Sequence, residues 1–133
     1  MTLKRIIGVV LFPEFELLDV FGPLEMYGIA GEHFDIRMIS EDGQNVASRQ
    51  GPKSVVEHSF GDAVRYDILL VPGGHGTRRE VDNKTMLSWW RCCINRASPH
   101  IWGYEQAKTE VSHSELAGVQ RRVGRTWIVD GVV

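Results

Sequence analysis

A glycine-rich turn after an apolar run is the first place in this sequence where the residue types could support chemistry. The run Asp67 to Val71 has the length of a buried strand, and Pro72-Gly73-Gly74-His75-Gly76 follows it directly. Open α/β sheets bind ligands at the carboxyl ends of their strands, where such a turn presents backbone N–H groups. These groups can receive an anion or a developing oxyanion. Gly73, Gly74 and His75 are therefore candidate ligand-binding residues, and a tight turn without a ligand is the alternative.

Two carboxylates in the segment before this turn are candidate acids or bases. Glu25 lies four residues after Phe21 and seven after Leu18, on the apolar side of a helix predicted over Leu17 to Ala30. A carboxylate on that side is at least partly desolvated, which raises its pKa and suits it to acid–base work. A rotated helix that leaves Glu25 in water is the alternative. Asp19 begins the same helix, where a carboxylate commonly caps free N–H groups, so both capping and catalysis are open for it.

Other reactive side chains show no arrangement that indicates a metal or cofactor. The five histidines form no pair at metal-ligand spacing with a nearby cysteine or carboxylate, so no metal site is predicted. No dinucleotide or nucleoside-triphosphate motif occurs, and we expect no cofactor. Cys92 and Cys93 are adjacent in a helical pattern, where a disulfide between them would be strained. We interpret them as reduced packing residues in a reducing compartment.

The elements that must position these residues alternate between strand and helix. Continuous or alternating apolar runs predict three strands, and apolar residues at helical spacing predict two helices. This order indicates an α/β fold with a mainly parallel sheet and right-handed crossovers. The predicted strands are Ile6 to Phe12, which is expected to be central, Phe34 to Ser40 and Asp67 to Val71, and the helices are Leu17 to Ala30 and Lys84 to Arg96, the second capped by Asp82 or Asn83.

Shorter elements are expected around this framework, and the pattern weakens after the second helix. Asn45 to Ser48 and Val55 to Phe60 are short edge pieces. The last part of the chain is predicted to hold a short strand at His100 to Tyr104, a polar helix at Glu105 to Leu116, and a strand and turn at Arg125 to Val133.

Length and charge favour one domain that binds a small neutral molecule or another protein. The 133 residues fit a single domain over 1–133. The formal charge is −2 and no basic block occurs, which argues against a nucleic-acid surface. The apolar segment at the N-terminus is broken at Pro13 and is too short to span a membrane, so we expect a cytoplasmic protein without a membrane partner.

The stretches IGVVLFPEFELLDVFGPLEMYG and DILLVPGGHGTRRE resemble the ThiJ/PfpI superfamily, with its class I glutamine-amidotransferase-like fold. Within that superfamily, the stretches look like the branch of isocyanide hydratases and the amidase-like domains of AraC-type regulators. The resemblance is strongest over 6–96 and implies a flavodoxin-like three-layer sandwich. It also implies that Asp19 orients a substrate or water, that Glu25 hydrogen-bonds a nucleophilic cysteine, and that Gly73 and Gly74 supply oxyanion N–H groups.

The resemblance breaks where the family carries its nucleophile, a cysteine on a sharp turn after a strand. Counted from Arg96, that position falls near Trp102, and no cysteine occurs beyond Cys93. Residues 97–133 diverge and are too few, which predicts a family member with an internal deletion or altered reading and a truncated C-terminus. Loss of a covalent nucleophile removes most of the activity. Exposed sheet edges and helix surfaces then favour a homodimer.

Three functions are compatible with these residues. The first is a non-catalytic domain that binds a small molecule or regulates through dimerisation. The second is a surviving hydratase or hydrolase, in which Glu25 or Asp19 activates water or in which Cys92 or Cys93 enters the site. The third is a degenerate product that folds but has no selected function.

Overall fold

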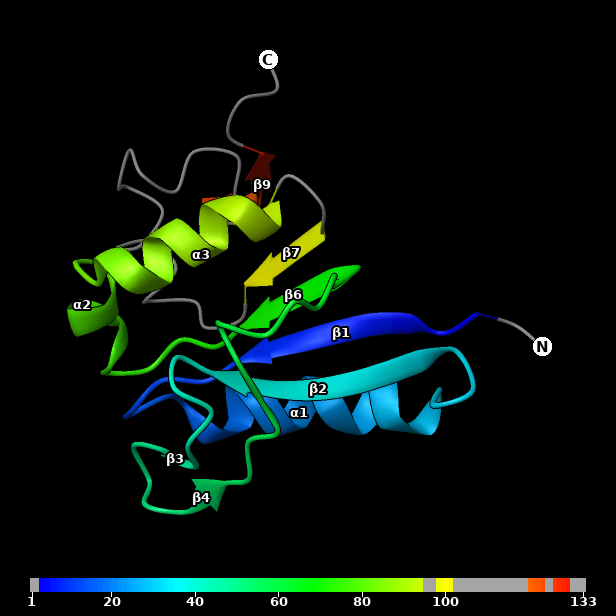
Figure 1. The fold of residues 1–133 in the computed structure, drawn as a ribbon, viewed down its shortest axis with the longest axis horizontal. Coiled ribbons are helices and arrows are strands. Elements are labelled where there is room, and N and C mark those ends of the chain that lie inside the picture. The colour runs from blue at the N-terminus through cyan, green and yellow to red at the C-terminus, as the bar shows by residue number, and fades with distance from the viewer. Residues whose placement is uncertain (1–2, 95–97, 102–119, 124–125, 130–133) are drawn as a thin grey trace.

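A five-stranded parallel sheet forms the centre of the protein. The structure, a computed structural model, describes residues 3–94, 98–101, 120–123 and 126–129. The strand order is β5-β2-β1-β6-β7, and every pairing in this sheet is parallel (Figure 1). The strands are β1 (Arg5–Val10), β2 (Phe34–Ser40), β5 (His58–Ser59), β6 (Ile68–Val71) and β7 (Ser98–Ile101).

The continuous apolar runs form the buried middle of this sheet, as predicted. Strand β1 pairs with β2 on one side and with β6 on the other, so it is the central strand. Ile7, Val9 and Val10 have no exposed surface, and all four residues of β6 are buried. Strands covered on both faces must be apolar throughout, because each face packs against a helix layer. The predicted second strand, Phe34 to Ser40, is confirmed over its whole length.

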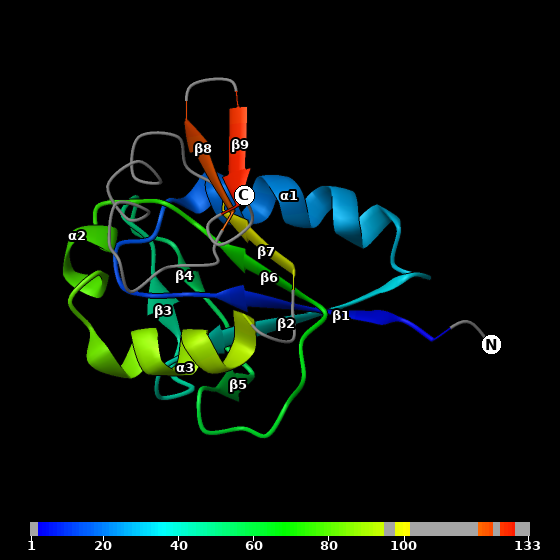
Figure 2. The same cartoon turned by 90° about the horizontal axis from the view of Figure 1, so that it is seen from above.

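Helices cover both faces of the sheet and complete an α/β sandwich. Helix α1 (Leu17–Ile29) lies on one face and α3 (Lys84–Ile94) on the other (Figure 2). The short helix α2 (Thr77–Glu80) connects β6 to α3. Pro23 lies inside α1 and is buried, so the helix neither begins nor ends there. The last two residues predicted for the second helix fall outside the described residues.

Helix α1 carries two apolar faces, and only one of them packs on the sheet. Val20 and Pro23 are buried, and the partly buried hydrophobics Leu17, Leu24 and Tyr27 lie on the same side of the helix. The opposite side carries the exposed hydrophobics Leu18, Phe21, Met26 and Ile29, of which Leu18 is 74% and Ile29 83% exposed. We call these four residues the outer face of α1.

Asn83, one of the two residues predicted to cap the second helix, caps α3. Its side chain also donates hydrogen bonds to two carboxylates. Its Oδ1 accepts hydrogen bonds from the backbone N–H groups of Thr85 at 3.1 Å and Met86 at 3.2 Å. Its Nδ2 donates to Glu41 at 2.7 Å and to Glu80 at 2.8 Å. The cap satisfies N–H groups that have no partner within the helix.

Removing this cap is expected to destabilise the domain. We predict that Asn83→Ala lowers the free energy of unfolding by about 1–2 kcal/mol, whereas Asn83→Ser, which keeps a capping oxygen, costs less. Urea unfolding monitored by circular dichroism measures both variants. Equal losses in the two variants would show that the cap contributes little.

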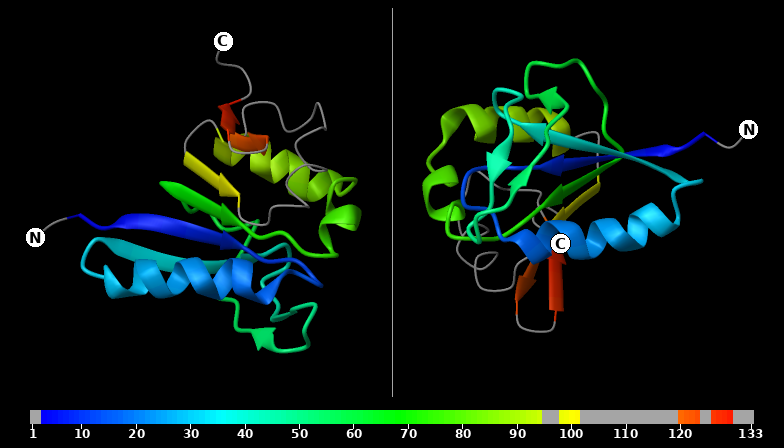
Figure 3. Two further views of the ribbon diagram at one scale, coloured as in Figure 1. Left: turned by 180° about the vertical axis from the view of Figure 1, so that it is seen from behind. Right: turned by 90° about the horizontal axis from the view of Figure 1, so that it is seen from below.

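Two small antiparallel pairs lie outside the main sheet. One joins β3 (Val46–Ala47) to β4 (Lys53–Ser54), and the other joins β8 (Gln120–Val123) to β9 (Thr126–Val129). Figure 3 shows the first pair and α2 at the edge where β1 and β2 end. The strand predicted at His100 to Tyr104 is instead Ser98–Ile101, and the predicted helix at Glu105 to Leu116 lies outside the described residues.

Within the described part of the chain, no helix is long and apolar enough to cross a membrane.

Candidate functional site

Asp19 and the glycine turn meet at the carboxyl edge of the sheet. The Gly73 N–H, two residues beyond β6, donates a hydrogen bond of 2.9 Å to the Asp19 carboxylate in the first turn of α1. The residues are 54 positions apart in sequence, and the crossover topology brings them together. The strand order changes direction between β1 and β6, because β2 is added on one side of β1 and β7 on the far side of β6. Open α/β sheets bind ligands at this kind of position.

The environment of Asp19 raises the pKa of its carboxyl group above the ordinary value of 3.8. Burial is the largest cause, because desolvation penalises the charged form. The hydrogen bond from Gly73 opposes the shift, and the nearby negative charge of Glu16 adds to it. The N-cap residue of α1, Glu16, makes no side-chain capping bond, and the Leu17 N–H is bound by Gln50. The Asp19 carboxylate therefore binds the glycine turn, and none of the hydrogen bonds among the described residues joins it to the N–H groups at the start of α1.

Backbone contacts fix the glycine turn against the segment between β1 and α1. The Glu16 N–H donates to the Gly73 carbonyl at 2.9 Å, and the Gly76 N–H donates to the Glu14 carbonyl at 3.2 Å. Gly74 has a φ of +122°, and a β-carbon there would lie 2.5 Å from the Glu16 nitrogen. Only glycine fits this conformation and this approach. The turn is therefore rigidly placed beside the start of α1.

One predicted donor of the turn is engaged, and another, on the buried residue Gly74, has no described acceptor. The Gly73 N–H is already bonded to Asp19. Among the described residues, the Gly74 N–H has no hydrogen-bond acceptor, whereas its carbonyl accepts from Thr77. The His75 side chain belongs to an exposed residue. The backbone N–H that could donate to an oxyanion at this turn is therefore that of Gly74. The Gly73 N–H instead holds the Asp19 carboxylate in place.

Glu14, in the segment between β1 and α1, forms a charged cluster that the sequence pattern did not indicate. Glu14 has a φ of 65°, which is unusual for a residue other than glycine. Its carboxylate pairs with Arg49 at 2.8 Å and with Arg79 at 3.8 Å. Gln50 accepts from the Leu17 N–H at 3.1 Å and so binds the first turn of α1. These partners lie more than thirty residues apart, so neither helical nor strand spacing could indicate them.

Of the two environments predicted for Glu25, partly buried or in water, the structure shows the second. Glu25 is exposed, and it lies roughly 9 Å along the helix axis from Asp19, at six residues' separation. The prediction placed it correctly with Leu18 and Phe21, but these residues form the outer face of α1. The sheet packs against the other apolar face, which carries Val20 and Pro23. The structure thus brings together Asp19, Gly73 and Gly74, and not Glu25.

The two cysteines lie at the opposite edge of the sheet from Asp19. Cys92 and Cys93 are near the end of α3 and line a cavity of about 270 Å³ with Tyr66, which precedes β6. Gly73 follows β6, and seven residues of extended chain span roughly 23 Å. Neither cysteine enters the candidate site, so the hypothesis of a hydratase or hydrolase that uses Cys92 or Cys93 there is wrong. Trp102, near which the nucleophile of the family is expected, lies outside the described residues. Among the residues that are described, no group of three or more histidine, cysteine, aspartate or glutamate side chains could hold a metal ion.

The fold and this site define a flavodoxin-like α/β domain with an acid and a glycine turn at the carboxyl edge of its sheet. The model of the DJ-1/PfpI family matches residues 4–100, and the chain belongs to this family. A search of curated proteins gives no match.

Solved structures with this fold include several members of the same superfamily. A ThiJ/PfpI family protein from Pseudomonas syringae has 25% identity and a TM-score of 0.67, over 74% of this chain and 40% of its own. A cysteine-to-alanine mutant of a DJ-1 superfamily protein from Salmonella typhimurium has 18% identity and a TM-score of 0.73, over 86% and 64%. Oxidized DJ-1 from Toxoplasma gondii has 18% identity and a TM-score of 0.68, over 85% and 63%. The chain spans less than two thirds of the length of each.

Proposed function

We propose that this chain is a small-molecule-binding domain of the DJ-1/PfpI type that acts without a cysteine nucleophile. Its ligand carries a carbonyl, amide or isonitrile group and binds between Asp19 and Gly74. The hydrogen bond between the Asp19 carboxylate and the Gly73 N–H carries this proposal. It keeps a half-buried carboxylate and a glycine turn together at the edge of the sheet where ligands bind.

The groups at this site complement an amide. The Gly74 N–H, which has no acceptor among the described residues, donates to the carbonyl oxygen of the ligand. Asp19 uses Oδ2 for Gly73, and its Oδ1 remains to accept the N–H of the ligand. Partial burial strengthens both bonds, because solvent screens them less. A cysteine is not needed for this recognition.

A hydratase or hydrolase activity is the alternative, and the raised pKa of Asp19 favours it. A carboxyl group with a raised pKa exchanges protons more readily near neutral pH, so it could direct a water molecule onto a bound isonitrile or amide. An isonitrile-hydration assay separates the two functions. We expect the wild-type rate to equal the rate of Asp19→Asn and of the buffer. Turnover in the wild type that Asp19→Asn abolishes would establish the enzyme instead.

The outer face of α1 supports a homodimer as part of this proposal. Leu18, Phe21, Met26 and Ile29 place exposed apolar side chains together along one side of the helix. Monomeric soluble proteins seldom expose such a patch, and a second copy of the chain would cover it. A cytoplasmic location, predicted from the sequence, is also part of this proposal.

Changing this face is expected to give a monomer. We predict that Phe21→Glu shifts the mass measured by light scattering from that of a dimer to about 15.0 kDa, the mass of one chain. Val55→Glu is the matched control, because Val55 is also an exposed apolar residue, 67% exposed, but lies between β4 and β5 and not on α1. A dimer that survives Phe21→Glu, or one that Val55→Glu also dissociates, would place the interface elsewhere.

A further inference from the structure

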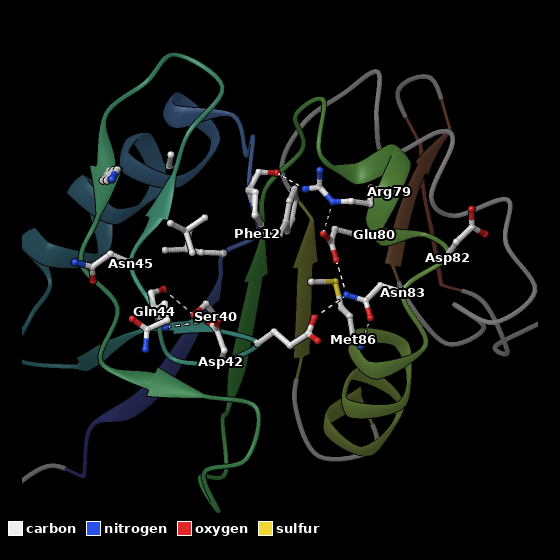
Figure 4. Close-up of a pocket in the computed structure, with 16 residues that line it drawn as sticks. Phe12, Ser40, Asp42, Gln44, Asn45, Arg79, Glu80, Asp82, Asn83 and Met86 are labelled. Carbon is white, nitrogen blue, oxygen red and sulfur yellow. Dashed lines mark hydrogen bonds and ion pairs between the residues drawn. The ribbon is translucent and has the colours of Figure 1, made fainter.

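A second cavity, of about 780 Å³, lies at the carboxyl edge of the sheet on the side covered by α2 and α3. It separates the segment that follows β2 from the connection between α2 and α3 (Figure 4). Leu11, Phe12, Val46 and Met86 form its apolar floor, and each is less than a tenth exposed. Asp19, Gly73 and Gly74 do not line it, so it is separate from the candidate site.

The size and position of this cavity fit a binding site for a small organic molecule. Ligand pockets in proteins commonly measure about 300–1,000 Å³ and combine an apolar lining with a few polar groups. The cavity opens beyond the ends of β1 and β2, at the edge of an open α/β sheet where ligands bind. A molecule with an apolar body would cover the floor.

The walls of the cavity determine the charge of that molecule. They carry four carboxylates and two cations, a formal charge of −2: Glu41, Asp42, Glu80 and Asp82 against Lys53 and Arg79. One of the cations is already engaged inside the protein, because Arg79 donates to the Pro13 carbonyl at 2.9 Å and to Glu80 at 3.2 Å. Its ion pair with Glu80 removes one charge of each sign, so three carboxylates remain against Lys53 and the lining keeps a formal charge of −2.

Glu41 and Asp42 have only neutral partners for their charges. Glu41 accepts from the Asn83 amide at 2.7 Å, and Asp42 accepts from the Gln44 N–H at 3.0 Å and the Ser40 hydroxyl at 3.4 Å. Neither carboxylate forms an ion pair with a described residue, and both line the cavity. Figure 4 shows Asp42 and Asn83 on facing walls. A cation between these walls would neutralise the Glu41 and Asp42 carboxylates. The apolar floor nearby reduces the screening of this attraction by water.

We propose that this cavity is a second ligand site and that it takes an organic cation, a primary ammonium or guanidinium group on an aromatic or aliphatic body. The body packs on Phe12 and Met86, and the cationic group lies against Glu41 and Asp42. Neutral molecules of the same shape bind more weakly because they leave these carboxylates uncompensated, and carboxylate-bearing molecules are repelled.

Three indole compounds that differ in the charge of the side chain test this site. Calorimetric titration of the full chain with tryptamine, tryptophol and indole-3-acetate compares a cation, a neutral molecule and an anion on one aromatic body. We expect tryptamine to bind about tenfold more tightly than tryptophol, indole-3-acetate to bind least, and added sodium chloride to weaken only tryptamine. Equal affinities, or no saturable binding of tryptamine, would overturn the proposal.

Two matched variants test whether tryptamine binds in this cavity. Glu41→Gln keeps an oxygen for the Asn83 amide and removes the charge, and we expect it to weaken tryptamine binding about fivefold. Glu57→Gln is the control, because Glu57 is also an exposed glutamate but does not line the cavity. The same loss in both variants, or a loss in neither, would contradict this location. Asp19→Asn should leave tryptamine binding unchanged, so this site and the proposed amide site can fail independently.

Discussion

Gly74→Ala is expected to destabilise the domain by about 3 kcal/mol or more, the largest effect of any single change proposed for this protein. Two costs combine at this position. The φ of +122° is a conformation that side chains with a β-carbon rarely adopt. The added carbon would also lie 2.5 Å from the Glu16 nitrogen and 2.6 Å from the Glu14 carbonyl oxygen. Both contacts are with backbone, which cannot move aside as a side chain would.

Urea unfolding of Gly74→Ala and Gly28→Ala measures this effect against a matched control. Gly28 lies within α1, and a β-carbon there meets no atom within 4 Å. Alanine is favoured over glycine inside helices, so Gly28→Ala should raise the free energy of unfolding by about 0.5–1 kcal/mol. A Gly74→Ala variant as stable as the wild type would contradict the close packing of the glycine turn on the start of α1.

Asp19→Asn is expected to weaken amide binding at least about tenfold while making the folded protein more stable at neutral pH. The loss of affinity follows from replacing a charged hydrogen-bond acceptor, which contributes about 1.5–3 kcal/mol. The gain in stability follows from the raised pKa of Asp19, whose largest cause is burial of the charge. Asparagine carries no charge to desolvate, and its Oδ1 can still accept from the Gly73 N–H.

The stability difference should depend on pH in a defined direction. The carboxyl group of Asp19 has a higher pKa in the folded than in the unfolded chain, so its stabilising contribution is fully present below pH 3.8. That contribution is lost as the pH rises through the raised pKa. The advantage of Asp19→Asn should therefore be present at pH 7 and vanish on acidification. Unfolding curves at both pH values check this, and an advantage that grows in acid would show that the pKa is lowered instead.

The sequence was sufficient to predict the three central strands of the sheet and, as separate candidates, the site residues Asp19, Gly73 and Gly74. Strands β1 and β6 are apolar in every residue that must be buried on both faces, so their positions followed from pattern alone. The glycine turn and Asp19 were identifiable because each lies next to such an element. The hydrogen bond between them depends on how the chain crosses from β1 to β6. The sequence pattern does not show this crossover directly, and only the predicted fold class implies it.

The parts that could not be predicted depend on which surfaces pack together. Helix α1 has apolar residues around most of its circumference, so spacing could not tell that Val20 faces the sheet and that Phe21 and Glu25 face outward. The ion pair between Glu14 and Arg49 joins two loops, and loops carry no periodic signal. The same holds for the acidic cavity, whose walls come from segments around residues 41 and 80.

The central claim is that Asp19 and Gly74 bind an amide without covalent chemistry. A titration of ¹⁵N-labelled protein with benzamide, followed by ¹H–¹⁵N correlation spectra, tests it most directly. We predict that the Gly73, Gly74 and His75 amide signals move in a saturable way, return when benzamide is removed, and do not move in Asp19→Asn. Signals that stay fixed in the wild type, or that move equally in Asp19→Asn, would contradict the claim.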